Sequence, residues 1–450
     1  MTTQLATPAT THRRTVRSRR QLGIAAVGVA VLGGLAVVPA AASAVPPATT
    51  RISVDSTGGQ AVEYRSEPFG VSADGQYVAF TSAAPNLTPG DTNETWDVLI
   101  RDRRTGTTSR VSQSTAGVAG DSSSYGHSLS PDGRYVSFTS EAANLVPGDT
   151  NGASDGFIHD RRTGRTSRVT LTDGDAQADA RSYAPAISAD GRFVAFVSDA
   201  TNLVSGDTNG VADIFLRDRQ AGTTVRVSGT NADAASDAPA ISADGRFVAF
   251  TSEATNLVPG DTNGTADVFL RDLRTGSLRR ANVATSGGQA NGLTVSPTVS
   301  ADGRFVAFSS EATNLVSGDT NGVADVFVRD LRAGTTARVS VPAAGGQAGG
   351  GSSYGPMMSA DGRFVAFSSE ATNLVSGDTN GVADVFVRDL RAGTTVRASL
   401  AADGGEGNDA SYNGVVTRDG RHVAFASAAT NLVPGDTNGV IDVFLRRMPG

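Results

Sequence analysis

A short word, Asp-Gly-Arg, returns along this 450-residue chain with a regularity that constrains the fold more than any other feature. Seven copies occur, the first as Asp-Gly-Gln, and their aspartates are Asp74, Asp132, Asp190, Asp244, Asp302, Asp361 and Asp419. The spacings between them are 58, 58, 54, 58, 59 and 58 residues. We therefore expect one repeat domain over residues 51–447, built from seven similar units.

Each unit contains four short strand-like runs. In the unit that begins at Ala238, the second run, "RFVAFTS", and the third, "DVFLR", carry apolar residues on both faces, which is typical of strands covered on both sides. The fourth run alternates, as in "TTVRVS" (223–228), and suits a partly wetted outer strand. "ADG" and "RTG" are hairpin signals. Seven four-stranded units of this length predict an all-β, seven-bladed β-propeller.

The two ends of the chain complement each other. The last unit stops at "DVFLRRMPG" after its third strand, whereas the segment 51–56, "RISVDS", resembles a fourth strand with no unit before it. We expect the N-terminal strand to complete the last blade, which would close the ring without a mismatched edge.

The words "SADGRFVAFSS" and "DVFVRDL" resemble the WD40-like repeats of the TolB-type propeller family, over about residues 51–447. The resemblance implies the fold, and it leaves function open because such propellers serve as binding platforms and also as enzymes. The additional N-terminal domain of TolB has no counterpart in this sequence, so the partners of TolB are not implied.

The first 44 residues are typical of an export signal. "THRRTVRSRRQLG" is basic, Leu22–Val38 is apolar, and Ala42-Ser43-Ala44 offers a cleavage site. Arg19-Arg20 favours the twin-arginine route over general secretion, and an uncleaved anchor is the third alternative. Residues 45–50 form a short proline-containing spacer. We expect a secreted or cell-envelope protein, periplasmic if the source has an outer membrane, with no membrane span after cleavage.

Charge and composition exclude several classes of site and partner. The chain has no cysteine, so it forms no disulfide and no thiolate metal site. Removing residues 1–44 removes five arginines and no acid, which moves the formal charge from −7 to −12. An acidic body without a basic run argues against nucleic acid as a partner. We expect a monomer.

Aromatic side chains mark a candidate binding surface. Several segments between units carry a tyrosine near the start of the innermost strand: Tyr64, Tyr125, Tyr183, Tyr354 and Tyr412. They are placed to surround the mouth of the central channel, where they would bind a sugar or peptide or else pack loops onto blades. Trp96, the single tryptophan, lies in the first unit's long loop and is either a ligand contact or a loop plug.

A second candidate site is the recurring loop "GDTNG", which joins the second and third strands. Its first aspartates are Asp91, Asp149, Asp207, Asp261, Asp319, Asp378 and Asp436, and six residues later follow Asp97, Asp155, Asp213, Asp267, Asp325, Asp384 and Asp442. The pattern is similar to calcium loops, although two carboxylates and one amide are few for an ion that takes 6–8 oxygens. The alternative is that these side chains hold the turn.

We interpret the chain as an exported, non-catalytic propeller that binds a protein, peptide or glycan through the face carrying these loops. No cofactor is required, and calcium is the one candidate ion. The competing hypothesis is an extracellular enzyme acting on polysaccharide or peptide with acids at the channel mouth. Its candidate residues are Glu63, Glu67, Asp121, Asp179 and Glu406.

Overall fold

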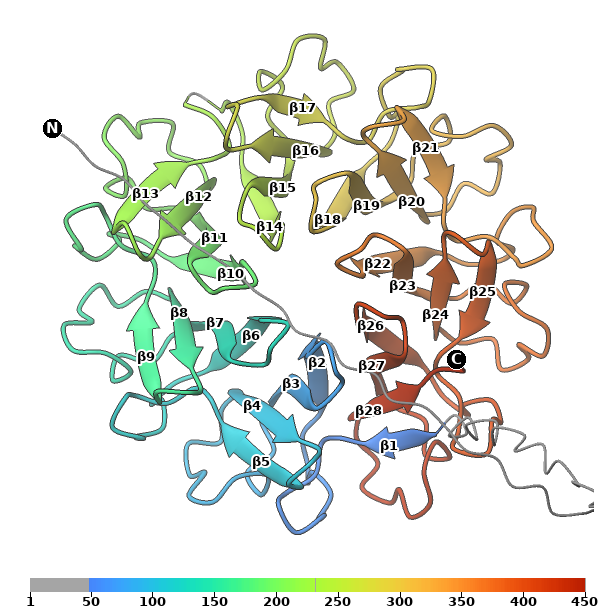
Figure 1. Cartoon of the computed structure of the whole chain (residues 1–450), viewed down its shortest axis with the longest axis horizontal. Coiled ribbons are helices and arrows are strands. Elements are labelled where there is room, and N and C mark those ends of the chain that lie inside the picture. The colour runs from blue at the N-terminus through green and yellow to red at the C-terminus, as the bar shows by residue number, and fades with distance from the viewer. Residues whose placement is uncertain (1–47, 231, 450) are drawn as a thin grey trace, which may run out of the picture. The chain divides into compact units, whose positions relative to one another are not determined.

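Seven antiparallel four-stranded sheets are arranged as the blades of a ring (Figure 1). This computed structural model describes residues 48–230 and 232–449. The expected export signal, residues 1–44, lies outside the described residues. The prediction of an all-β, seven-bladed propeller is confirmed.

The four strands of a blade recur in the same order from the channel outward. The innermost strands are β2 (Ser66–Val71), β6 (Ser124–Leu129), β10 (Ser182–Ile187), β14 (Ser236–Ile241), β18 (Thr294–Val299), β22 (Ser353–Met358) and β26 (Ser411–Val416). The second strands are β3 (Tyr77–Ser82), β7 (Tyr135–Ser140), β11 (Phe193–Ser198), β15 (Phe247–Ser252), β19 (Phe305–Ser310), β23 (Phe364–Ser369) and β27 (His422–Ser427). The third strands are β4 (Asp97–Asp102), β8 (Asp155–Asp160), β12 (Asp213–Asp218), β16 (Asp267–Asp272), β20 (Asp325–Asp330), β24 (Asp384–Asp389) and β28 (Asp442–Arg447). The outer strands are β5 (Thr107–Arg110), β9 (Arg165–Arg168), β13 (Thr223–Arg226), β17 (Leu278–Arg280), β21 (Thr335–Arg338), β25 (Thr394–Arg397) and β1 (Thr49–Arg51).

The N-terminal strand closes the ring, as the sequence predicted. β1 pairs antiparallel with β28, with Thr50 opposite Leu445. The pairing begins at Thr49, two residues before the expected start, and so includes the end of the expected spacer. Beyond the strand, the Ser53 hydroxyl donates to Asp442 Oδ1 at 2.5 Å, which anchors this segment in the last blade.

The apolar core fills the space within and between the blades. In six blades a phenylalanine of the second strand stacks on one of the third, as Phe196 does on Phe215 with ring centroids 5.8 Å apart. Both rings are fully buried. One core cluster joins Val78 and Phe80 of the first blade to Val443 of the last. Apolar side chains are therefore also buried between the two blades that meet where the ring closes. The third strands are apolar on both faces because each blade packs against the blades on either side of it.

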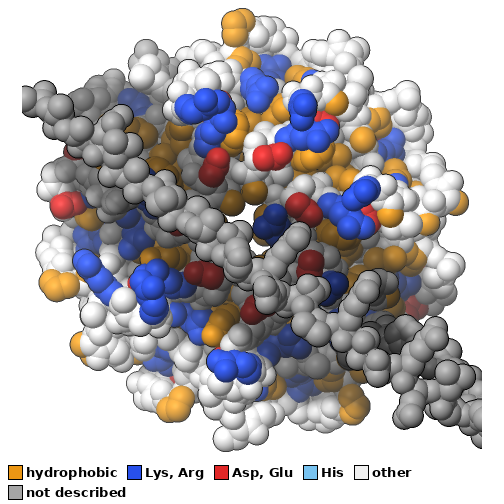
Figure 2. Space-filling model, viewed as in Figure 1, with side chains coloured by type: hydrophobic (Ala, Val, Ile, Leu, Met, Phe, Trp, Pro, Cys, Tyr) orange, Lys and Arg blue, Asp and Glu red, His pale blue; other side chains and the backbone are white. Residues whose placement is uncertain are grey.

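The "GDTNG" loops and the segments that lead into each blade lie on the same face of the ring. Asn93 of the first loop donates through its side-chain amide to the carbonyl of Gly120, in the segment that enters the second blade, at 2.9 Å. We call this the loop face. Figure 2 shows one side of the molecule, where acidic side chains lie near the centre of the ring with arginines beside them and further out. The part of the chain that the structure describes contains no candidate membrane-spanning helix.

Candidate functional site

The second residue of each innermost strand lies near the loop-face end of the channel. These seven residues, which we call the mouth positions, are Glu67, Tyr125, Tyr183, Asp237, Val295, Tyr354 and Tyr412. Four of the five predicted tyrosines occupy them. Tyr64 does not, because it precedes β2, and Glu67 takes the equivalent place in the first blade.

The mouth positions affect one another electrostatically. Burial and the neighbouring Asp237 carboxylate raise the pKa of Tyr183 to about 12. Burial also raises the pKa of Tyr412, with Glu67 as a second cause. The ring is therefore mixed, with phenols, two acids and one valine, and differs from blade to blade although the blades themselves are alike.

A cleft of about 300 Å³ opens between the first two blades, beside Glu67 and Tyr125. Trp96, the residue before β4, lies against Tyr125 with ring centroids 6.2 Å apart and planes tilted by 35°. The Arg65 guanidinium carbon is 5.4 Å from the indole centroid, and Arg65 also pairs with Glu67 at 3.1 Å. We call Arg65, Glu67, Trp96 and Tyr125 the aromatic cleft.

The first two blades are built differently around this cleft. Their innermost strands shift register at Pro68/Gly70 and Gly126/Ser128, whereas in the third blade the shift spans Tyr183/Ala186. The Phe69 ring occupies the space where a side chain at position 126 would lie, 1.9 Å from an added Cβ, so any larger residue at Gly126 would displace this ring. The cleft thus depends on residues that depart from the repeat.

Trp96 is itself such a departure. The equivalent residues are Ser154, Ala212, Ala266, Ala324, Ala383 and Ile441. The Trp96 carbonyl accepts a hydrogen bond from Ser124 N at 2.7 Å, and the Ala212 carbonyl accepts the same bond from Ser236 N at 2.8 Å. The backbone arrangement therefore does not require the indole, which leaves the side chain available for contact with a ligand.

The aspartates of the "GDTNG" loops are paired with an arginine of the same blade. An arginine from the outer strand lies against both aspartates of its loop: in the fourth blade, Arg280 is 3.0 Å from Asp261 and 3.0 Å from Asp267. We call this Asp-Arg-Asp arrangement a clasp. The clasp arginines are Arg110, Arg168, Arg226, Arg280, Arg338, Arg397 and Arg51, in blade order. In the sixth blade the ion pair joins Arg397 to Asp384 and Glu406, while Asp378 acts on it through its charge.

Sequence reasoning missed these arginines, although every unit shows one in the fourth strand, as in "RVS". The second aspartate of each loop is fully buried. Burial raises the pKa of Asp97, Asp155 and Asp384 to about 6. The loop asparagine also holds the turn, because Asn151 Oδ1 accepts from Ala153 N at 3.1 Å and its amide donates to the Ala178 carbonyl at 3.1 Å.

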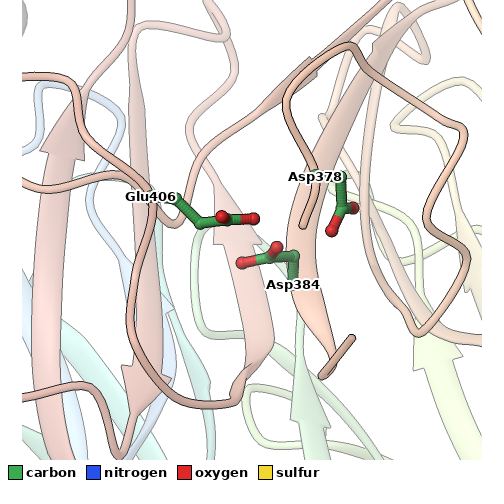
Figure 3. Close-up of side chains that lie close together, drawn as sticks. All are labelled: Asp378, Asp384 and Glu406. Atoms are coloured by element: carbon green, nitrogen blue, oxygen red, sulfur yellow. The ribbon is translucent and has the colours of Figure 1, made fainter. Parts of the chain in front are cut away.

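One clasp carries a third acid (Figure 3). Glu406 stands where Gln60, Gln177, Gln289 and Gln347 contact the loops of other blades. Oxygen atoms of Asp378, Asp384 and Glu406 lie within 4.8 Å of one another, the one such group of three among the described residues. Although burial opposes it, hydrogen bonds from Thr379 and Arg397 lower the pKa of Glu406 to about 2. The sixth clasp therefore has three carboxylates for one arginine, whereas the other clasps have two.

The acids of the enzyme hypothesis are held in separate places. Asp121 accepts from Ala143 N at 2.9 Å, and Asp179 accepts from Thr201 N at 2.8 Å, so both fix loops of their own blades. Glu406 belongs to the sixth clasp. Glu63 precedes β2 with a φ of 67°. Of the five, Glu67 alone lines the aromatic cleft.

Comparison with known proteins shows the fold. No family model and no curated protein matches the sequence. An oligogalacturonate lyase solved in complex with manganese is 13% identical, with a TM-score of 0.53 over 91% of this chain and 94% of that one. The β-propeller domain of the Trilobed protease from Pyrococcus furiosus is 10% identical, with a TM-score of 0.51 over 86% and 94%. A putative TolB from Agrobacterium tumefaciens is 17% identical, with a TM-score of 0.39 over 61% and 88%. At identities this low the comparison shows the fold alone, and the chemistry of this chain is argued from its own residues.

Proposed function

We propose that this protein is an exported, non-catalytic binding platform whose ligand contacts the loop face at the aromatic cleft. The observation that carries the proposal is the cleft itself, where Trp96 of the first blade and Tyr125 of the second face a hollow of about 300 Å³. Aromatic walls with a few placed polar groups are the usual composition of a small-ligand site.

The chemistry of the cleft favours a glycan over the other candidate partners, a protein or a peptide. The indole and phenol rings offer flat apolar surfaces to the C–H face of a sugar ring, and Arg65 and Glu67 offer a donor and an acceptor for its hydroxyls. The volume suits one or two sugar units rather than a long groove-filling segment.

The arrangement of acids supports binding without catalysis. Glycosidase chemistry uses two carboxyl groups roughly 5–10 Å apart. Glu67 is the one acid among the residues that line the cleft, and it pairs with Arg65. The solved oligogalacturonate lyase and peptidases of this fold are enzymes by their names, so the comparison alone leaves both roles open to a propeller.

The proposal is tested by screening the mature chain on immobilised glycan and peptide arrays beside two variants. Trp96→Ala introduces the residue that four other blades carry, so the fold should be preserved. Loss of a central aromatic anchor should weaken the best glycan signal by at least about tenfold. Tyr354→Ala removes the aromatic ring at the mouth position of the sixth blade, which corresponds to Tyr125 and lies outside the aromatic cleft; it is the control and should bind as wild type. Equal signals from wild type and Trp96→Ala would contradict the proposal.

A further inference from the structure

In six blades the outer strand is covered by the chain segment that leads into that blade. A threonine of the outer strand donates its hydroxyl to a backbone carbonyl of this segment, at 2.5–2.8 Å. The threonines are Thr49, Thr108, Thr166, Thr224, Thr336 and Thr395, and all six are buried. The covering segment thus forms an extra layer on the outer edge of the sheet.

Among the residues that the structure describes, the fourth blade lacks this layer. The spacing of 54 residues places four fewer residues before it: segment 229–235 joins the same two points that segment 283–293 joins before the fifth blade. The register of β16 with β17 puts Leu278 where the other blades have threonine. Leu278 is partly exposed, and an apolar side chain has replaced the buried hydroxyl.

The missing layer leaves a groove of about 760 Å³ on the outer rim. Its walls include Leu257, Leu273 and Leu278, together with Arg226 and Arg271, and no acidic residue is among those that line it. Arg271 donates from Nε to the Val227 carbonyl at 3.0 Å and from Nη1 to the Gly276 carbonyl at 2.8 Å. Among the described residues it forms no ion pair. Arg226 is already paired with Asp207 and Asp213, so Arg271 is the positive charge that this groove of mixed leucine and polar residues offers to a ligand, on a protein that is acidic overall.

The arginines equivalent to Arg271 in other blades show which acceptor groups bind at this position. In the third blade, Arg217 Nη1 donates to the Thr172 carbonyl at 2.8 Å, and Nη2 pairs with Asp175 Oδ1 at 2.5 Å. Both acceptors belong to the covering segment. In the first blade, Arg101 Nη1 donates to the carbonyl of Asp55 at 2.8 Å in the same way. The third blade thus shows a turn that supplies both a carbonyl and a carboxylate to the arginine, and the first blade shows the carbonyl contact alone.

We propose that the groove over β17 receives an acidic turn of a partner protein, which takes the place of the missing covering segment. Its carboxylate pairs with Arg271, and its apolar side chain packs on Leu278. The six covered blades indicate that a turn fits this place, and the pairing of Arg217 with Asp175 in the third blade indicates that the turn is acidic. The site lies between the third and fourth blades, is separate from the aromatic cleft, and does not depend on the proposed function.

The probe is a fluorescein-labelled peptide with the sequence of residues 170–178, TLTDGDAQA, which is the segment that covers the third blade. Its Asp175→Asn counterpart is the control. Titrated with the full chain and followed by anisotropy, the first peptide should bind at one saturable site, and the second about tenfold more weakly. With Arg271→Gln, the two peptides should bind equally.

A variant in which segment 283–293 replaces segment 229–235 should fill the groove and abolish peptide binding. Leu278→Glu, at a partly exposed position, is a second route to the same loss through like charge. Peptide binding that survives both variants, or no saturable binding by wild type at millimolar peptide, would overturn the proposal. A concentration-dependent dimer that the replacement abolishes would overturn it in favour of a second copy of this chain.

Discussion

Arg226 of the outer strand β13 donates from Nη1 to Asp213 Oδ2 of β12 at 2.9 Å, and the carboxylate is fully buried. The Ser228 hydroxyl donates to the other oxygen of Asp213 at 2.5 Å. The same arginine reaches Asp207 in the loop at 3.1 Å. One guanidinium therefore ties the outer strand, the third strand and the long loop of a blade together.

Removing this guanidinium leaves buried carboxylates without their cation. Arg226→Leu should lower the free energy of unfolding by about 3 kcal/mol or more, because an uncompensated buried charge is costly. Val225→Ala, on the same strand at a side chain that is 48% exposed, is the control and should cost less than about 0.5 kcal/mol. Urea unfolding of both variants checks this, and equal losses would contradict a structural role for the clasp.

Ring closure by β1 makes a second prediction. Deleting residues 1–56 removes the pairing with β28, together with Arg51 and Ser53, which hold Asp442. We expect a loss of more than about 3 kcal/mol, since the last blade is opened and a buried acid loses its partners. Deletion of residues 1–47 alone should leave the melting temperature unchanged. Identical melting of the two truncated chains would rule out this closure.

The repeat made the architecture predictable. The candidate site was harder to predict, because it is built from residues that differ from the repeat. Spacing, hairpin signals and the unmatched strand runs at the two ends gave seven closed blades. In the sequence the clasp arginine is one polar residue of an alternating strand, and nothing there shows that it contacts aspartates of the neighbouring strand and loop. The position of Tyr64 shortly before the first innermost strand predicts that it belongs with the four other tyrosines, whereas the register of β2 gives Glu67 the mouth position. The aromatic cleft needs Trp96 and Tyr125 from two different blades, a contact that only the folded ring creates.

The clasps should make the fold independent of calcium. In every blade except the sixth, an arginine already pairs with both loop aspartates, where an ion would bind, so a chelator should leave the melting temperature unchanged. If added calcium raises the melting temperature, we expect it to act at the sixth clasp, which has Glu406 as a third acid. Glu406→Gln introduces the residue found in four other blades and should remove that effect. A melting temperature that falls with chelator and recovers with calcium, in wild type and in Glu406→Gln alike, would show that ions hold the other loops.

Stability should be greatest in mildly acidic solution. Burial raises the pKa of Asp97, Asp155 and Asp384 to about 6, so between about pH 4 and 6 the folded chain holds more protons than the unfolded one. The free energy of unfolding therefore falls as the pH rises through that window. Arg192 lowers the pKa of Asp218 to about 2, and this contribution is lost as the pH falls below about 4. Calorimetry at fixed ionic strength should show a higher melting temperature near pH 5 than near pH 7.5, and Asp155→Asn should reduce the difference.

Trp96 is the single tryptophan of the chain, so its fluorescence reports on the aromatic cleft directly. The most direct test of the account is to titrate the wild-type protein with the strongest ligand from the glycan array and to record tryptophan emission. We expect a saturable change in emission whose midpoint equals the dissociation constant measured by calorimetry. If calorimetry detects binding while the emission of Trp96 stays constant, the ligand binds elsewhere, which would contradict binding at the aromatic cleft.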